Sequence, residues 1–212
     1  MSTRTLARRA ALAGVGLTAA FALAACGGDH STDGGHGGHG GAPAGAVSAG
    51  GSAAAADSAD VMFAQMMIPH HQQAVRMSEL AGSRADDPEV KQLAERIRAA
   101  QAPEIATMTG WLTAWGRPVP SGSPAGGQPP GMDHGMPGMM SDADLVRLEG
   151  AAGREFDRQF LTMMIAHHEG AITMAREELA DGRDAGARAM AQQIVTSQQS
   201  EIDLMRRILA RR

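Results

Sequence analysis

The sequence contains one long segment twice. Met66–His71 (MMIPHH) returns as Met163–His168 (MMIAHH), and 167 − 70 = 97 gives the offset. The same offset, without insertion, aligns Asp60/Asp157, Phe63/Phe160, Ala74/Ala171, Met77/Met174, Ala94/Ala191, Ile97/Ile194, Gln101/Gln198, Glu104/Glu201, Ile105/Ile202, Met108/Met205 and Leu112/Leu209. A gapless repeat of this length predicts two copies of one supersecondary unit.

In each copy, both methionines precede a histidine by four residues, as Met66 precedes His70 and Met67 precedes His71. Residues four apart on a helix are neighbours, with β-carbons about 5–6 Å apart. A thioether and an imidazole can therefore face one ion from consecutive turns. The candidate metal ligands are Met66, Met67, His70, His71, Met77, Met163, Met164, His167, His168 and Met174.

The alternative is that these methionines only fill the core, as methionines on a helical stripe usually do. The adjacent histidines favour metal ligation instead, because four buried imidazoles without partners would be costly.

The first 25 residues are typical of an export signal. Arg4, Arg8 and Arg9 precede the uncharged apolar run Ala10–Ala25, which is shorter than the about 20 residues that span a bilayer. The run ends in small residues before Cys26, which indicates a bacterial lipoprotein signal with lipidation of Cys26. An ordinary signal peptide cut nearby and a twin-arginine signal are the alternatives.

Cys26 is the only cysteine, so the chain forms no internal disulfide, and any soft metal ligand must be a methionine. Removal of residues 1–25 takes away three arginines and no acidic residue, which changes the formal net charge from −4 to −7. An acidic exported protein argues against a nucleic-acid partner. The predicted partners are metal ions and, through the lipid anchor, a membrane.

Two segments have compositions that do not support a core. Residues 26–56 are rich in Gly, Ala and Ser, carry spaced histidines, and are expected to be a disordered tether. Residues 116–141 form a second, Gly- and Pro-rich linker. We interpret its end as a flexible loop that captures soft metal, with unconstrained drift as the alternative; the linker candidates are Met132, His134, Met136, Met139 and Met140.

Apolar residues at helical spacing predict two helical hairpins, over residues 57–115 and 142–212. Asp57 or Ser58 is expected to cap the first helix, residues 82–87 to form its turn, and Pro88 to begin the second helix. Pro69 and Pro103 lie inside these helices and should bend them.

The second half is expected to contain a short helix over residues 142–149, a long helix over 154–180, a turn at 182–186 and a last helix to about residue 209. Two such hairpins predict an all-α, four-helix bundle that occupies residues 57–212.

The pattern Asp-x-x-Phe-x-x-Met-Met-Ile-x-His-His, followed by Gln-x-x-Glu-Ile-x-x-Met, resembles the domain-of-unknown-function 305 family, which includes CopM-like copper-binding proteins. The resemblance covers about residues 57–211. It implies a ferritin-like four-helix bundle, exported to the periplasm or cell surface, that binds copper or silver through the Met and His residues named above.

The donor types agree with this resemblance. Thioethers with imidazoles favour Cu(I) or Ag(I), and the histidines are compatible with Cu(II), whereas zinc gains little from methionine. Glu104 and Glu201 lie on the core stripes of the partner helices and either orient the imidazoles or pair with other buried polar groups. Asp60 and Asp157 precede the histidines by nearly three turns, so we interpret them as hydrogen-bonding or capping groups.

Two other functional classes remain open. A ferritin-like di-iron enzyme needs Glu-x-x-His motifs, and the sequence contains none, so we expect no enzyme of that type. The other class is a structural or partner-binding lipoprotein without metal. If the histidines are ligands with ordinary pKa values of about 6.5, metal binding should weaken steeply between about pH 7 and 5.

Overall fold

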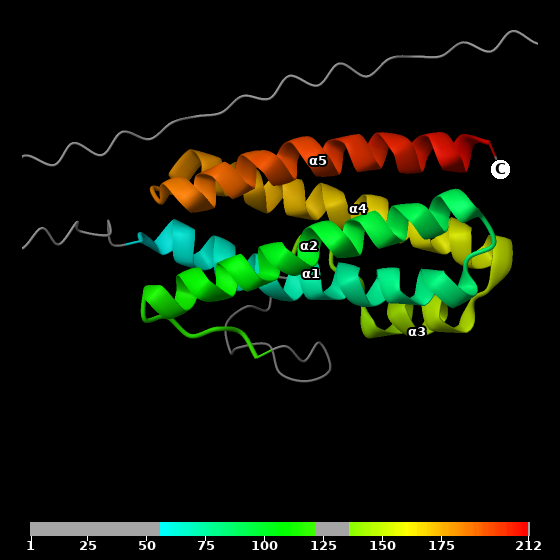
Figure 1. Ribbon diagram of the computed structural model, residues 1–212, viewed down its shortest axis with the longest axis horizontal. Coiled ribbons are helices and arrows are strands. Elements are labelled where there is room, and N and C mark those ends of the chain that lie inside the picture. Colours follow the sequence, from blue (N-terminus) through cyan, green and yellow to red (C-terminus); the bar gives the residue numbers. More distant parts are fainter. Residues whose placement is uncertain (1–55, 122–135, 212) are drawn as a thin grey trace, which may run out of the picture. The chain divides into compact units, whose positions relative to one another are not determined.

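The computed structural model describes residues 56–121 and 136–211. Their regular structure is helical throughout, without a strand. The helices are α1 (Ser58–Arg84), α2 (Pro88–Ala114), α3 (Asp142–Gly150), α4 (Gly153–Asp181) and α5 (Ala185–Ala210) (Figure 1). Within these described ranges, no helix is long and apolar enough to cross a membrane.

The helix ends follow from local side-chain chemistry. Asp57 caps α1: its carboxylate accepts hydrogen bonds from the backbone N–H groups of Ala59 and Asp60, while the Asp60 carboxylate accepts from the Asp57 N–H. This reciprocal capping box satisfies N–H groups that have no partner inside the helix. Pro88 begins α2, where its missing N–H costs nothing. α1 continues through Pro69 as one helix.

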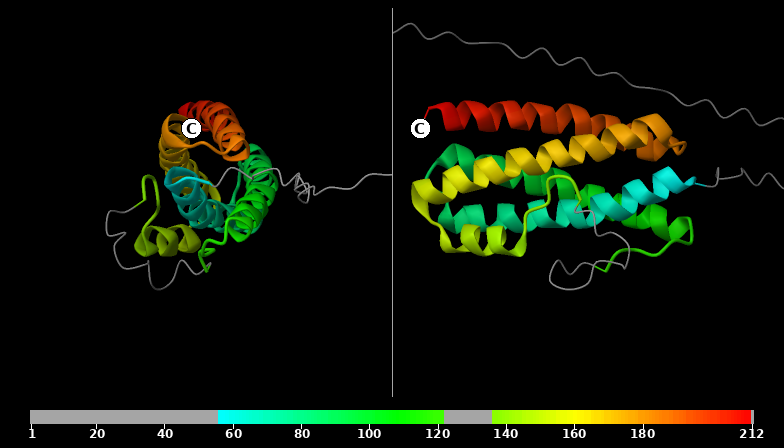
Figure 2. Two further views of the ribbon diagram at one scale, coloured as in Figure 1. Left: turned by 90° about the vertical axis from the view of Figure 1, so that its left-hand side faces the viewer. Right: turned by 180° about the vertical axis from the view of Figure 1, so that it is seen from behind.

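Two hairpins form the bundle, as expected from the repeat. α1 packs along α2, α4 packs along α5, and α1 and α4 make the main contact between the hairpins. The end-on view in Figure 2 shows these four helices around a common centre, with the short α3 outside them against α1 and α4. The predicted all-α, four-helix bundle is confirmed.

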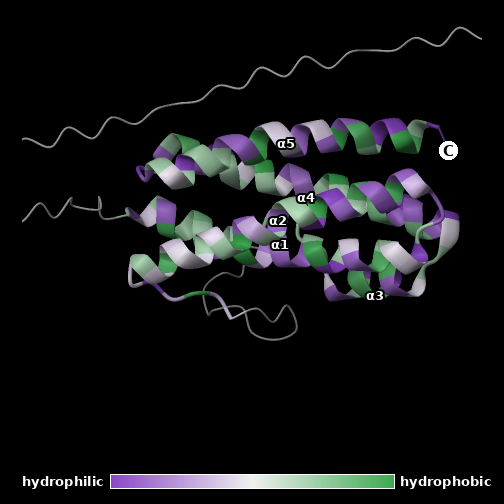
Figure 3. Ribbon diagram, in the orientation of Figure 1, coloured by the Kyte–Doolittle hydropathy of each residue, from purple (hydrophilic) through white to green (hydrophobic). Residues whose placement is uncertain are grey.

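The core follows the apolar stripes of the four long helices. Its fully buried side chains include Phe156 and Phe160, whose rings stack with centroids 5.8 Å apart, and Leu93 and Ile97 of α2. Each such side chain contributes about 1.5–3 kcal/mol when it is removed from water. Figure 3 shows apolar and polar positions interleaved along every helix, as amphipathic helices require.

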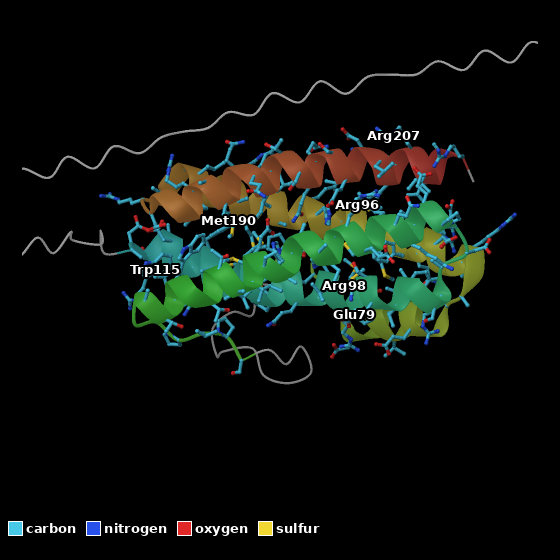
Figure 4. The ribbon with its side chains drawn as sticks, in the orientation of Figure 1. Glu79, Arg96, Arg98, Trp115, Met190 and Arg207 are labelled. Atoms are coloured by element: carbon cyan, nitrogen blue, oxygen red, sulfur yellow. The ribbon has the colours of Figure 1, made fainter. Side chains whose placement is uncertain are left out.

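Charged side chains cover the outside of the bundle. Glu79 of α1, Arg96 and Arg98 of α2, and Arg207 of α5 are exposed, and Figure 4 shows them on the outer surfaces of their helices. Their position away from the core leaves the bundle interior to apolar residues and to a small set of buried polar groups. That set determines the candidate site.

A pseudo-twofold relation between the hairpins is visible in their hydrogen bonds. The Asp157 carboxylate of α4 accepts from the backbone N–H groups of Asp86 and Asp87 in the first turn, both at 3.1 Å. The Asp60 carboxylate of α1 accepts from the equivalent N–H groups of Arg183 and Asp184, at 2.8 and 2.9 Å. α1 and α4 therefore run antiparallel, and each helix holds the turn of the other hairpin.

Glu178 breaks this symmetry near Asp60. It is 1% exposed, lies against the Asp60 carboxylate, and stands where the first copy has Ala81. Burial and the nearby Asp60 raise the pKa of Glu178 to about 8. This carboxyl group is therefore largely protonated at neutral pH.

Candidate metal centre

The four histidines of the repeat meet in the middle of the bundle. His70 and His71 of α1 and His167 and His168 of α4 are completely buried. The rings of His70 and His167 are in contact, with centroids 3.7 Å apart and planes inclined by 39°. Because these two residues are equivalent in the repeat, the local twofold relation passes between them.

The other two histidines each contact a glutamate of the partner helix in their own hairpin. His71 Nε2 lies 2.7 Å from Glu104 Oε2, and His168 Nε2 lies 2.6 Å from Glu201 Oε2. The two glutamate side chains are only 13% and 21% exposed. The structure thus places Glu104 and Glu201 directly beside imidazoles, where they fix the orientation of the rings. It places Asp60 and Asp157 on the hairpin turns instead.

The hydrogen-bond acceptors determine which ring nitrogens are protonated. His70 Nε2 lies 3.0 Å from the carbonyl oxygen of Pro137, which can only accept, so this nitrogen carries the proton. In neutral His70 the lone pair is then on Nδ1, which is buried without a hydrogen-bond partner. The Nδ1 atoms of His71 and His168 are also buried and unpartnered, as are both ring nitrogens of His167.

Burial keeps the central pair of imidazoles neutral. Burial and the adjacent His71 lower the pKa of His70 to about 3. Burial, followed by the neighbouring His70 and His168, lowers the pKa of His167 well below its usual value. The sequence-based expectation of proton competition between pH 7 and 5 assumed an ordinary imidazole pKa. The lowered pKa of His70 moves the competition at this ring to lower pH.

A short segment before α3, Met136–Met140, lies over this pair of histidines; we call it the strap. Its first four residues form a turn in which the Met139 N–H donates to the Met136 carbonyl at 3.2 Å. Pro137 and Gly138 are its central residues, and Gly138 has φ +77°, the arrangement of a type II turn. Figure 2 shows this segment beside α1 and α4 before α3 begins.

Both α1 and α4 hold the strap. On α1, the Gln73 side chain donates to the Met140 carbonyl at 2.9 Å and accepts from the Met140 N–H at 2.8 Å. On α4, a β-carbon at Gly170 would overlap the Pro137 carbonyl, so only glycine permits this approach. A β-carbon at Gly138 would likewise overlap the backbone of α4. The strap is thus docked by hydrogen bonds on one side and by close backbone packing on the other.

The packing of the strap differs from the expectation drawn from the sequence. We expected the methionines of the linker to have no core to fill, but Met140 packs against the buried cluster that contains Met163. Met136 and Met139 are half-buried. Met132 and His134, like Cys26 and the export signal, lie outside the described residues.

The methionines of the repeat differ in exposure. Met67, Met77, Met164 and Met174 are buried, as is Met163, which is 9% exposed. Met66 is half-buried and lines, with Met174 and Glu178, a surface hollow of about 140 Å³. Among the described residues, no three His, Cys, Asp or Glu side chains are grouped as a preformed metal site. A metal at this centre would therefore need thioether ligands, or a rearrangement, beyond the histidine pair.

Sequence reasoning missed the residues that dock the strap. Gln73 and Gly170 occupy the same position of the repeat, since 170 − 73 = 97, yet they are chemically unlike. That mismatch lies close to histidines that recur at the same spacing in both copies, so it was a usable signal. The role of the Pro137 carbonyl was not visible in the sequence, because any residue supplies a carbonyl.

Comparisons with known proteins identify the family of this chain. The sequence profile of a family described as domain of unknown function 305 (DUF305) matches residues 60–209, which include both copies of the repeat. The chain belongs to the DUF305 family. No curated protein matches it. A DUF305 protein from Streptomyces coelicolor, described as a putative secreted protein, is 39% identical with a TM-score of 0.65, over 73% of this chain and 93% of that one.

Two further solved structures share the fold. A DUF305 fragment from Deinococcus radiodurans is 34% identical with a TM-score of 0.65, over 74% of this chain and 99% of that one. CopM in its Cu(II)-bound form is 35% identical with a TM-score of 0.61, over 72% of this chain and 96% of that one. CopM has also been solved in Cu(I)-bound and Ag-bound forms.

Proposed function

We propose that this DUF305 protein is an exported protein that binds Cu(I) or Ag(I) at the paired histidines of its bundle and serves in copper handling or resistance. The observation that carries the proposal is the set of buried imidazole nitrogens without partners. Burying a polar atom without a hydrogen bond costs about 1–3 kcal/mol, and five such atoms lie on four adjacent rings. A metal ion at these nitrogens would offset that cost.

The opposite nitrogens support the same interpretation. A metal-ligating histidine almost always donates its other N–H to a carboxylate or a carbonyl, which fixes its ring and raises its basicity. His71 and His168 have a glutamate in this position, and His70 has the Pro137 carbonyl. Three of the four rings are thus oriented as ligands are oriented in metal proteins.

The donor set indicates the kind of metal. Thioethers and neutral imidazoles suit Cu(I) and its mimic Ag(I), while the imidazoles are also compatible with Cu(II). The similarity to CopM, which has been solved with Cu(I), Cu(II) and Ag, supports this choice. The proposed ligands come from His70, His71, His167 and His168 and from the methionines one turn away and on the same stripes: Met66, Met67, Met77, Met163, Met164 and Met174.

The competing proposal of a di-iron enzyme has less support. Within residues 56–121 and 136–211, the only glutamates that contact the histidines are Glu104 and Glu201, one for each hairpin, and the sequence has no Glu-x-x-His motif. A di-iron carboxylate site requires four carboxylates around two metals. The residues at this centre do not fit that site.

The first test measures metal preference. The protein should retain Cu(I) or Ag(I) at chelator concentrations that remove Zn(II) completely. The reason is that thioether sulfur binds these soft ions well and binds zinc only weakly. A titration followed by the ring resonances of His70 and His167 reports on this centre alone, free of the linker methionines. Equal or stronger retention of zinc would contradict the proposed site.

We further propose that the protein is held on the outer face of a bacterial membrane by lipid on Cys26. The apolar run before Cys26 and its small-residue ending support this anchor. Replacement of Cys26 by serine should release the protein from the membrane fraction or leave its signal uncleaved. Membrane attachment with normal processing in the C26S variant would show that another feature anchors the chain.

A further inference from the structure

The strap makes two equivalent halves of the centre unequal. The repeat places His70 and His167 in matching positions, yet only the His70 ring has a hydrogen bond to the strap, from Nε2 to the carbonyl of Pro137. The position three residues after this histidine carries Gln73 in α1 and Gly170 in α4. Each of these residues docks one side of the strap: Gln73 through its side-chain amide, and Gly170 through its lack of a β-carbon.

The geometry of the strap leaves little freedom to the Pro137 carbonyl. The turn from Met136 to Met139 fixes the peptide plane that follows Pro137. Gly170 lets this carbonyl approach the backbone of α4, and the two hydrogen bonds of Gln73 hold the end of the strap on α1. The carbonyl is thereby presented to His70 Nε2 as a fixed acceptor.

We propose that the strap determines the tautomer of His70, and that Gln73, Pro137, Gly138 and Gly170 act as positioning residues for the metal centre. Because Nε2 must donate to the Pro137 carbonyl, His70 binds metal through Nδ1 while the strap is docked. The His167 ring has no hydrogen bond to the strap. The centre is therefore asymmetric: one histidine has a preset ligating nitrogen, and its partner adapts to the ion.

The metal part of this inference rests on the proposed function, whereas the tautomer of His70 does not. Outer-sphere acceptors of this kind typically change metal affinity by about 10–100-fold when they are lost. Displacement of the strap should therefore weaken binding at His70 without removing any of the ligands proposed on α1 and α4.

The test compares two glycine-to-alanine variants of the whole chain. In Gly110→Ala, a glycine inside α2 with open space around it, the new methyl group meets nothing and should leave His70 unchanged. In Gly170→Ala, the β-carbon must displace Pro137. Gln73→Leu provides a second variant, which removes both hydrogen bonds between the strap and α1.

Long-range 1H–15N spectra of the metal-free protein should show His70 protonated on Nε2 in the wild type and in G110A. In G170A and Q73L we expect a mixture of tautomers and, in Ag(I) titrations followed on the His70 ring, an affinity about 10-fold lower. A wild-type His70 protonated on Nδ1 would overturn the proposal. So would an unchanged affinity in variants whose tautomer has changed.

One outcome separates this inference from the proposed function. If wild-type His70 is protonated on Nε2 but Ag(I) leaves both ring spectra unchanged, the strap controls the tautomer, and the metal-binding function is overturned together with the assignment of Nδ1 as a ligand.

Discussion

The double substitution His70→Ala and His167→Ala is expected to lower the affinity of the bundle for Ag(I) and Cu(I) by at least about 100-fold, because loss of even an outer partner of a ligand costs about 10–100-fold. Both rings are completely buried and in contact, and together they carry three of the unpartnered nitrogens. Competition titration against a Cu(I) chelator measures the effect.

The control for this experiment removes a histidine that lies elsewhere. His39→Ala changes a histidine of the Gly-rich tether and should leave the affinity of the bundle unchanged. A thermal melt of each variant is needed, because two deleted rings leave a cavity that also destabilises the fold. A folded double variant with wild-type affinity would show that His70 and His167 are core residues and not ligands.

Metal-free protein is expected to lose stability steeply as the pH falls from 6.5 toward 3. Burial lowers the pKa of His70 to about 3, whereas in the unfolded chain it is about 6.5. A base whose pKa is lowered by folding contributes fully to the free energy of unfolding above pH 6.5. This contribution is lost as the pH falls through the pKa of the folded state. For His70 alone this difference corresponds to at most about 5 kcal/mol, comparable to the whole stability of many domains.

Urea unfolding at pH 7, 5 and 4 in the presence of a chelator measures this loss. His70→Gln with His167→Gln removes both titrating rings, so the stability of the variant should fall much less than that of wild type. Glu178 acts in the opposite direction, since its raised pKa stabilises the fold at low pH, and its contribution cancels in the comparison. Parallel pH profiles for the two proteins would show that other groups cause the acid sensitivity.

The sequence by itself determined the helices and their pairing. The gapless repeat required two like hairpins, and the stripes of Leu93, Ile97 and their equivalents required a shared core. Capping and proline chemistry placed the helix ends within a few residues, at Asp57 and Pro88 for example. These features were predictable because they depend on residues close together in the chain or on an exact internal comparison.

The sequence predicted the members of the candidate site but not the contacts between them. Spacing along one helix identified His70, His71 and their repeats as a set, and the core stripe of α2 singled out Glu104. Which imidazole meets which partner depends on the crossing of α1 and α4 and on the rotation of each hairpin. Only the tertiary structure shows that His71 contacts Glu104 while His70 contacts His167.

Two properties of the centre belong entirely to the tertiary structure. The lowered pKa of His70 comes from burial between helices, which no local pattern encodes in full. The asymmetry comes from the backbone carbonyl of Pro137, a residue that lies 67 positions from His70 in the sequence. The repeat determined that the two histidines are equivalent in sequence, and the docking of a segment outside the repeat made them different, because a single strap cannot contact both halves of a twofold site in the same way.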